Sequence, residues 1–359
     1  MNRIVPILII SLIVISCGGE DSGDPEIWSG NTESIKAVDI SSYPEIAISN
    51  PVYYDLDGNQ KDFLVILKES GVNTIRLRLW VNPVRGHSGL EEVKRFATTL
   101  KEHGFKIWLA LHYSDSWADP GQQEPPSEWQ DLGLAALKDS VYHYTARVVN
   151  QVQPSFIQIG NEINAGMLHP KGNIETNFRD FTSLVNEGCA AVRDNSSECQ
   201  IILHFAGLEN AAWFFSQVSE IDYDIIGLSY YPIWHGNSIS TLKSTLQQLD
   251  RQFNKEILIA ETAYPFTLAW NDWTNNIVGL EEQLILPEYP ATPEGQSAFI
   301  RQIRTLMEET ENGLGFCYWG AELIAWKGAQ STEASPWENQ ALFDFDNKAL
   351  PALNVFKGD

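Results

Sequence analysis

The feature that most constrains this chain is a regular alternation between short apolar segments and longer amphipathic ones. Eight apolar segments have the length and composition of buried strands: Lys36–Ile40, Thr74–Val81, Lys106–His112, Phe156–Gly160, Ile201–Phe205, Ile225–Ser229, Glu256–Ala260 and Gly313–Trp319. Apolar residues at three- and four-residue steps predict helices at Gln60–Ser70, Leu90–His103, Asp131–Val152, Asn177–Arg193, Glu209–Ser219, Ser238–Phe253 and Pro293–Glu311. Strands that alternate with helices form a parallel sheet covered by helices.

Two architectures satisfy this alternation, an open doubly wound sheet and a closed (β/α)8 barrel. The open sheet usually has a glycine-rich phosphate loop after its first strand. Here the first predicted strand continues as DISSYPEIA, which contains no such loop. Because eight is also the number of strands that closes a barrel, we predict an α/β fold, a single (β/α)8 TIM barrel that spans residues 33–359.

The N-terminal segment has the pattern of an export signal. Residues 1–16 contain Arg3 and then an apolar stretch that is too short to span a membrane. The sequence VISC, which ends at Cys17, resembles a bacterial lipobox, so we expect removal of the signal and lipidation of Cys17. Residues 17–32 would form a flexible acidic tether. We therefore expect an exported outer-membrane lipoprotein on the cell surface; an ordinary signal with an incidental cysteine is the alternative.

Charge and cysteine content narrow the range of partners. The formal net charge of -23 disfavours nucleic acid and acidic polysaccharides as partners, and it suits a neutral substrate. Cys189 and Cys199 could form a disulfide in an oxidising compartment or remain two thiols, and Cys317 lies in a predicted core strand. No spacing of Cys or His residues predicts a zinc site.

Two glutamates stand at the ends of predicted strands. Glu162 follows the fourth strand, in IQIGNEINAG, and Glu261 follows the seventh, in ILIAETAYP. In a barrel, the loops after the strands all open on one face, and here the long loops after the third and seventh strands carry several tryptophans. Either glutamate alone could be a salt-bridge partner. Together, two carboxyl groups that face each other across a barrel mouth can cleave a glycosidic bond, one as a proton donor and the other as a nucleophile or base.

Other polar side chains end strands on the same face. Arg76 and Arg78 share one side of the second strand, where an arginine could hold a catalytic carboxylate ionised or could pair with a helix. Asn161 could hydrogen-bond a sugar hydroxyl next to the reacting carbon. The remaining candidates, which could contact a sugar or belong to the core, are His112, Tyr230, Tyr231 and Trp319.

Five motifs together resemble glycoside hydrolase family 53, the endo-β-1,4-galactanases. They are GVNTIRLRLWVNP, LHYSDSWADPGQQEPP, IQIGNEINAGMLHP, GLSYYP and IAETAYP, and their order and spacing match from DISSYP to the final strand. HYSD-x-WADPG is the most specific of them. The resemblance implies a (β/α)8 barrel that cuts the β-1,4-galactan side chains of pectin by a retaining mechanism. It also implies that Glu162 is the acid/base and Glu261 the nucleophile, and we expect Arg78 to hold Glu261 ionised.

The same resemblance implies a set of substrate-binding residues. They are Arg78, His112, Asn161, a tyrosine of the SYYP stretch (Tyr230 or Tyr231) and Trp319 around the cleaved sugar, with Asp115, Trp117 and Asp119 shaping the groove. One departure is that Trp319 is followed by Gly-Ala-Glu, where the family often has Glu-Pro.

A bound metal is expected to play no part in the chemistry, and we expect no required cofactor. Some bacterial members of the family bind calcium in the loop after strand seven or eight. Oxygen ligands for calcium are present at Asn271, Asp272 and Asn275, but without a clear ligand spacing.

The distribution of aromatic residues over several loops predicts a groove that is open at both ends. We therefore expect cleavage within a neutral polysaccharide chain by a monomer that meets the membrane only through its lipid. Two alternatives remain open. One is a retaining barrel glycosidase that acts on β-mannan or β-glucan, and the other is a surface lipoprotein that binds glycans without cutting them.

Overall fold

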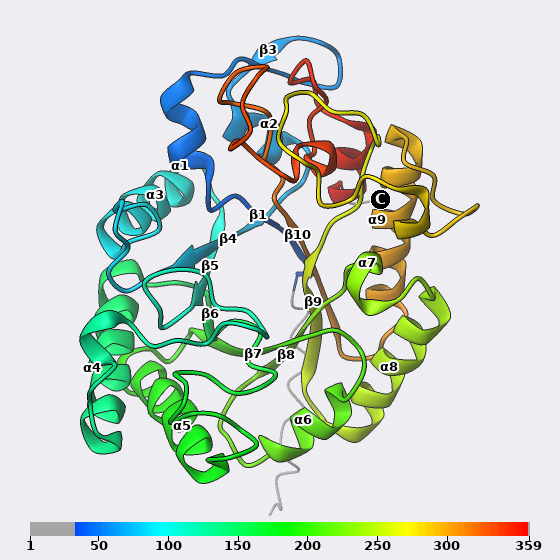
Figure 1. The fold of residues 1–359 in the computed structure, drawn as a ribbon. Helices are drawn as coiled ribbons and strands as arrows, with labels where there is room; N and C mark the ends of the chain where they lie inside the picture. The colour runs from blue at the N-terminus through cyan, green and yellow to red at the C-terminus, as the bar shows by residue number, and fades with distance from the viewer. Residues whose placement is uncertain (1–32, 358–359) are drawn as a thin grey trace, which may run out of the picture. The chain divides into compact units, whose positions relative to one another are not determined.

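The computed structural model describes residues 33–357, and these residues form a closed barrel of eight parallel strands (Figure 1). The strands follow the order β1-β10-β9-β8-β7-β6-β5-β4 and close between β4 and β1. Their bounds are β1 Ile35–Asp39, β4 Thr74–Leu79, β5 Lys106–Leu111, β6 Phe156–Ile159, β7 Gln200–Ala206, β8 Ile225–Ser229, β9 Glu256–Thr262 and β10 Gly313–Trp319. The predicted TIM barrel is confirmed. The predicted signal peptide, Cys17 and the tether up to residue 32 lie outside the described residues.

Helices surround the barrel and connect successive strands (Figure 1). Their bounds are α1 Tyr43–Ile46, α2 Phe63–Glu69, α3 Leu90–Glu102, α4 Leu134–Val152, α5 Phe178–Asn195, α6 Ala211–Gln217, α7 Pro232–His235, α8 Ile239–Gln252 and α9 Pro293–Glu308. Every predicted helix end lies within three residues of the observed one. No helix in the described part of the chain is both long and apolar enough to cross a membrane.

The first predicted helix begins too early in the sequence. Gln60–Lys61 forms the short strand β3, which pairs antiparallel with β2 (Tyr53–Tyr54). Helix α2 begins after Asp62, whose carboxylate accepts hydrogen bonds from the backbone N–H groups of Leu64 and Val65. A side chain that accepts hydrogen bonds from these free backbone donors fixes the residue at which a helix starts. The periodicity of apolar residues does not predict that start.

The interior of the barrel changes from apolar to polar along its axis. An apolar cluster separate from the main core fills it and consists of Ile35, Ala37, Trp108, Phe156, Ile202, Ile225, Leu258, Ala260, Leu314 and Cys317. Three inward positions two residues further along their strands are polar and buried: Asp39 after Ala37, Gln158 after Phe156, and His204 after Ile202. This apolar layer is a floor, and a polar layer lies on it at the carboxyl ends of the strands.

The three cysteines in the described residues are buried thiols. Cys189, Cys199 and Cys317 are all free, so the pair that could have formed a disulfide does not form one. Burial raises the pKa of the Cys189 and Cys199 thiols to about 12, which keeps them protonated and unreactive at neutral pH.

The pairing of β1 with β10 depends on a residue without a side chain. Gly315 pairs with Ile35, has φ +142°, and a Cβ there would lie 2.0 Å from the Ile35 carbonyl oxygen. We predict that Gly315→Ala lowers the free energy of unfolding by on the order of 3 kcal/mol, because both the backbone and the strand pairing must shift. Urea denaturation would measure the change. Gly133→Ala is the matched control, since nothing lies within 4 Å of its Cβ; an equal loss in both variants would contradict the assignment.

Candidate active site

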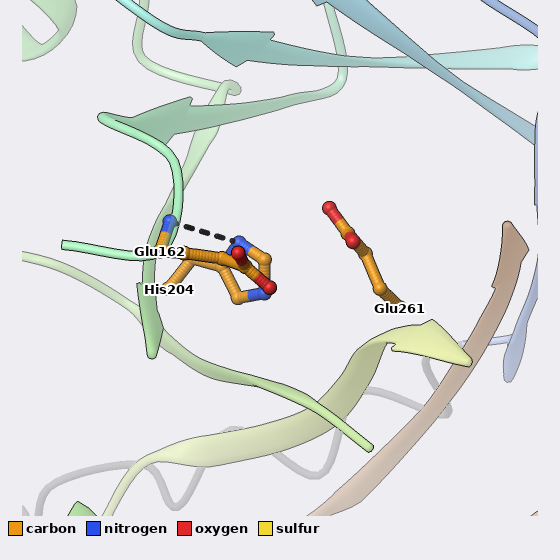
Figure 2. Close-up of side chains that lie close together, drawn as sticks. All are labelled: Glu162, His204 and Glu261. Carbon is orange, nitrogen blue, oxygen red and sulfur yellow. Dashed lines mark hydrogen bonds between the residues drawn. The ribbon is translucent and has the colours of Figure 1, made fainter. Parts of the chain in front are cut away.

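A pocket of about 430 Å³ opens at the carboxyl ends of the strands. It is lined by Asp39, Arg76, Arg78, His112, Trp117, Ala118, Asp119, Pro120, Asn161, Glu162, Ala206, Tyr231, Trp234, His235, Glu261, Trp319 and Trp337. Of the predicted site residues in the barrel, only Asp115 and Tyr230 are missing from this lining. Figure 2 shows Glu162 and Glu261 reaching towards each other across it.

A sharp turn after β6 places Glu162 in the pocket. Gly160 has φ +79°, and a Cβ there would lie 2.4 Å from the side chain of Ile163. Glu162 itself has φ +46°, a left-handed conformation that non-glycine residues seldom adopt. Such strain is kept where the surrounding structure holds it, and it is common at functional sites. Glu261 needs no such turn, because it belongs to β9 instead of following the strand as predicted.

The two carboxylates lie close together. One oxygen of Glu162 and one oxygen of Glu261 are within 4.8 Å of each other. Glycosidases that retain the anomeric configuration place their carboxyl groups roughly 5 to 5.5 Å apart, whereas inverting enzymes need roughly 6.5 Å or more to admit a water. The spacing therefore favours direct attack by one carboxylate over activation of a water between the two.

Glu261 is held by a buried arginine and a tyrosine. Arg76 Nη2 lies 2.7 Å from Glu261 Oε1, and Arg76 Nη1 lies 2.6 Å from Asp39 Oδ2. The Tyr231 hydroxyl donates to Glu261 Oε2 at 3.0 Å. The prediction that Arg78 holds Glu261 ionised is therefore wrong, since Arg76 does so. Both arginines face inward, but Arg76 lies two residues deeper in the barrel than Arg78. Its guanidinium lies over Trp108, with Cζ 5.5 Å from the ring centroid.

Arg78 occupies the rim of the pocket. Its Nε donates to Ser88 Oγ at 2.8 Å and its Nη2 to Ser42 Oγ at 3.2 Å. The guanidinium lies between Trp80 and Trp117, with Cζ 4.7 Å and 4.3 Å from the two rings. Arg78 thus holds the Trp117 ring against the pocket by cation–π contact, and it presents positive charge to one side of the groove.

The surroundings of the two carboxyl groups differ in a way that divides their roles. Burial raises the pKa of both Glu162 and Glu261; the negative charge of Glu261 raises the pKa of Glu162 further, and that of Asp39 raises the pKa of Glu261. Arg76 and the Tyr231 hydroxyl stabilise the charged form of Glu261. A pair this close titrates as a unit, so the proton they share resides on Glu162 while Glu261 is ionised.

Two more predicted residues present polar groups to the pocket. Burial and the charges of Arg76 and Arg78 lower the pKa of His112 well below its usual value, so the ring is neutral. Its Nδ1 accepts from the backbone N–H of Ala118 at 3.0 Å, which leaves Nε2–H free to donate to a ligand. Asn161 Nδ2 donates to the Ala118 carbonyl at 2.8 Å and keeps its second hydrogen for a hydroxyl.

A wall of tryptophans runs beside the carboxylates. Trp319 lies 6.2 Å from Trp117 and 4.5 Å from Trp337, and Trp337 lies 5.9 Å from Trp234, measured between ring centroids. Trp234 remains half exposed. Trp234 and Trp337 could not be predicted as site residues from the sequence, because neither directly ends a strand. Such a row of rings can stack on successive sugar faces.

Two predicted residues support the site without lining it. Tyr230 points away, and its hydroxyl donates to the Gly236 carbonyl at 2.9 Å, so Tyr231 is the tyrosine of the SYYP stretch that contacts Glu261. Asp115 accepts from the backbone N–H groups of Asn82 and Ser127, both at 2.9 Å. It therefore ties two loops together at the rim.

Oxygen atoms suited to a metal occur in two places. Among the described residues, Glu162, His204 and Glu261 form the one group of at least three His, Cys, Asp or Glu side chains close enough to share an ion. Glu261 already has Arg76 as its cation, so this group does not fit a metal.

The loop after β9, where the sequence offers oxygen ligands without a clear spacing, has a different set of free oxygens. Asp272 Oδ2, Asn276 Oδ1 and Glu338 Oε2 are buried without a hydrogen-bond partner, whereas Asn275 is exposed. They are the kind of ligand that calcium takes, but they lie outside the pocket and have no part in its chemistry.

Comparison with known proteins places this arrangement in a family. The family model described as glycosyl hydrolase family 53 matches residues 35–356. An arabinogalactan endo-beta-1,4-galactanase of Cellvibrio japonicus is 34% identical over 92% of this chain and 92% of its own length. The GH53 catalytic domain of Ignisphaera aggregans superposes with a TM-score of 0.85 at 36% identity, covering 94% of this chain and 97% of that one. A structure from a study of two fungal beta-1,4-galactanases gives 0.77 at 28% identity, covering 90% and 99%.

The SYYP stretch provides a matched pair of variants. We predict that Tyr231→Phe raises the pKa of Glu261, because it removes a hydrogen bond to the charged carboxylate, an interaction worth about 1.5–3 kcal/mol. Tyr230→Phe should leave that pKa unchanged. Titration of the glutamate carboxyl carbons by ¹³C NMR would measure both. An equal shift in the two variants would show that the tyrosine was assigned wrongly.

Proposed function

Because this chain is a member of glycosyl hydrolase family 53, we propose that it hydrolyses internal β-1,4-galactosidic bonds of galactan, such as those in the arabinogalactan side chains of pectin. The observation that carries the proposal is the pair of glutamates at the carboxyl end of the barrel. One carboxylate oxygen of Glu162 lies within 4.8 Å of one of Glu261, and Glu261 forms an ion pair with the buried Arg76. The name of the Cellvibrio japonicus relative supports this substrate.

In the first step, Glu261 attacks the anomeric carbon of the sugar whose bond is cut. The bond to the glycosidic oxygen breaks as Glu162 donates its proton to that oxygen, and the leaving part of the chain departs with a new hydroxyl group. The product on the enzyme is a glycosyl ester of Glu261, formed with inversion. Arg76 and Tyr231 orient the nucleophile and keep it ionised until it reacts.

In the second step, Glu162 acts as a base. Now ionised, it takes a proton from a water that attacks the same carbon, and the ester bond to Glu261 breaks. A second inversion restores the original configuration, and both carboxyl groups return to their starting protonation states. The partial exposure of Glu162 at the mouth of the pocket gives this water access.

The groove around the carboxylates supports a long, neutral substrate. Trp117 and Arg78 line the catalytic pocket and also a second depression of about 430 Å³, so the two adjoin at these side chains. A polymer that crosses both can be cut at an internal bond. The family membership weighs against the β-mannan and β-glucan alternatives, and the presence of both carboxylates weighs against a protein that only binds glycans.

The location of the protein is a separate part of the proposal. We propose that residues 1–16 direct export and that Cys17 carries a lipid that anchors the enzyme to the outer membrane at the cell surface, acting as a monomer. An extracellular polymer as substrate supports this arrangement.

The first test is hydrolysis of linear β-1,4-galactan, followed as new reducing ends. We expect activity in the wild-type protein and a loss of at least about 1,000-fold in Glu261→Gln, because the amide cannot form the ester. Glu294→Gln, at the start of α9, is the control and should keep full activity. Early products should span several lengths. A folded wild-type protein that releases only galactose from chain ends, or that cuts β-mannan instead, would refute the proposal.

A second test separates the roles of the two glutamates. On a substrate with an activated leaving group, azide should partly restore the rate of Glu162→Ala and give the β-azide, because the glycosyl ester on Glu261 still forms. Isolation of the α-azide from this variant would assign the nucleophile to Glu162 instead.

A further inference from the structure

Two buried side chains continue from Glu162 into the barrel wall and have no role in the reaction described above. Ser229, the last residue of β8, donates its hydroxyl to Glu162 Oε1 at 2.6 Å. Behind it, His204 of β7 places Nε2 2.8 Å from Ser229 Oγ. Both side chains are fully buried, so no solvent competes for these contacts. Figure 2 shows the imidazole directly behind the Glu162 side chain.

The other ring nitrogen of His204 faces donors. Gln158 Nε2 lies 2.9 Å from Nδ1, and the backbone N–H of Glu162 points to the same nitrogen at 3.4 Å. An N–H group can only donate, so an acceptor at Nδ1 fits both contacts. Protonation of Nδ1 would set three N–H groups against one another in a buried space.

The nearby acceptor does not change this assignment. Asn161 Oδ1 lies 3.2 Å from His204 Nδ1, but it already accepts from Arg76 Nη2 at 2.8 Å and from Gln158 Nε2 at 2.9 Å. Gln158 Nε2 has two hydrogens for three acceptors, because the Gly160 carbonyl also lies 3.0 Å from it. If one hydrogen goes to His204 Nδ1, that nitrogen is an acceptor; if both go elsewhere, both lone pairs of Asn161 Oδ1 are in use and Nδ1 has nothing to donate to. Burial and the charge of Arg76 lower the pKa of His204 well below its usual value, so the ring is neutral and carries its one proton on Nε2.

The direction of each hydrogen bond from His204 through Ser229 to Glu162 then follows. His204 Nε2–H donates to Ser229 Oγ, so the Ser229 hydroxyl hydrogen must point at Glu162 Oε1. Oε1 is an acceptor whether Glu162 is ionised or neutral, and the acid's proton is left to Oε2. We propose that His204 and Ser229 are positioning residues that confine the proton of Glu162 to Oε2, the oxygen that delivers it to the leaving group. The acid/base role of Glu162 in this statement rests on the proposed function.

Other groups around Glu162 set its pKa but do not choose between its oxygens. They are Glu261 on β9, Arg76 on β4, Asp119 in the loop after β5 and Tyr231 after β8. Of the groups that influence Glu162, Ser229 is the one that donates a hydrogen bond to its side chain. A test of the proposal must therefore separate the Ser229 hydroxyl from general changes in charge.

The first experiment reads the tautomer directly in the wild-type protein and needs no substrate. In ¹⁵N-labelled protein, the His204 signals are those absent from His204→Gln. We expect a protonated Nε2 and an unprotonated Nδ1 from roughly pH 5 to 9, where a free histidine would change charge. A proton on Nδ1, or an imidazolium in this range, would overturn the proposal.

The second experiment uses the pH profile of galactan hydrolysis. Because the Ser229 hydroxyl lowers the pKa of Glu162, Ser229→Ala should move the high-pH limb of kcat to higher pH. The rate at the optimum should fall about tenfold or more with KM unchanged, since the proton is no longer confined to one oxygen. Ser70→Ala, a buried serine after α2, is the matched control and should change neither.

Two substitutions at His204 test whether an N–H donor at this position is enough to preserve activity. His204→Gln places an amide N–H near the position of Nε2 and should keep much of the wild-type rate and profile, whereas His204→Leu should behave like Ser229→Ala. Equal losses of rate in His204→Gln and His204→Leu, with an unshifted pH profile, would mean that His204 acts only by packing. A wild-type protein that is inactive on galactan would refute the proposed function, and the tautomer measurement would still decide the proposal made here.

Discussion

The interaction on which the site depends is the buried contact of one guanidinium with two carboxylates, Asp39 and Glu261. Arg76 is 1% exposed, and a charge at that depth is tolerated only because both ends of its fork are paired. The apolar floor of the barrel, with Trp108 against the guanidinium, prevents Arg76 from extending to solvent below. With Nη1 committed to Asp39, Arg76 is fixed in place and can present Nη2 to Glu261 without rearranging.

That contact makes two identical residue types chemically different. Glu162 and Glu261 share the same pocket, and burial opposes ionisation of both. The difference lies in their partners, because a cation and a phenol hydroxyl face Glu261, whereas Glu162 has a single hydroxyl donor. With one proton between them, the position of Arg76 decides which carboxyl keeps it. In the proposed mechanism, the roles of nucleophile and acid are thus set by the residues beneath the two glutamates and not by their own sequence motifs.

The sequence predicts most of the fold and less of the site, for physical reasons that can be traced to particular residues. Apolar segments and strand-end glutamates are local patterns, and they predict the barrel, its strand order and the facing carboxylates. Arg76 and Arg78 both satisfy the inward period of β4, and choosing between them requires knowing the depth of the apolar floor. Tyr230 and Tyr231 differ only in which face of a turn they occupy. Trp337 reaches the pocket from a loop after β10, and no periodicity predicts where a loop folds back.

Glu162 presents the remaining problem, since it sits at a strained turn and yet must hold its carboxyl group in a defined orientation. His204 addresses both parts at once. Its Nδ1 accepts from the backbone N–H of Glu162, the residue at which the chain takes its left-handed turn. Its Nε2 reaches the carboxylate of the same residue through Ser229. One rigid ring thereby spans the main chain and the side chain of Glu162, so the strained turn and the orientation of the acid are held by the same group (Figure 2).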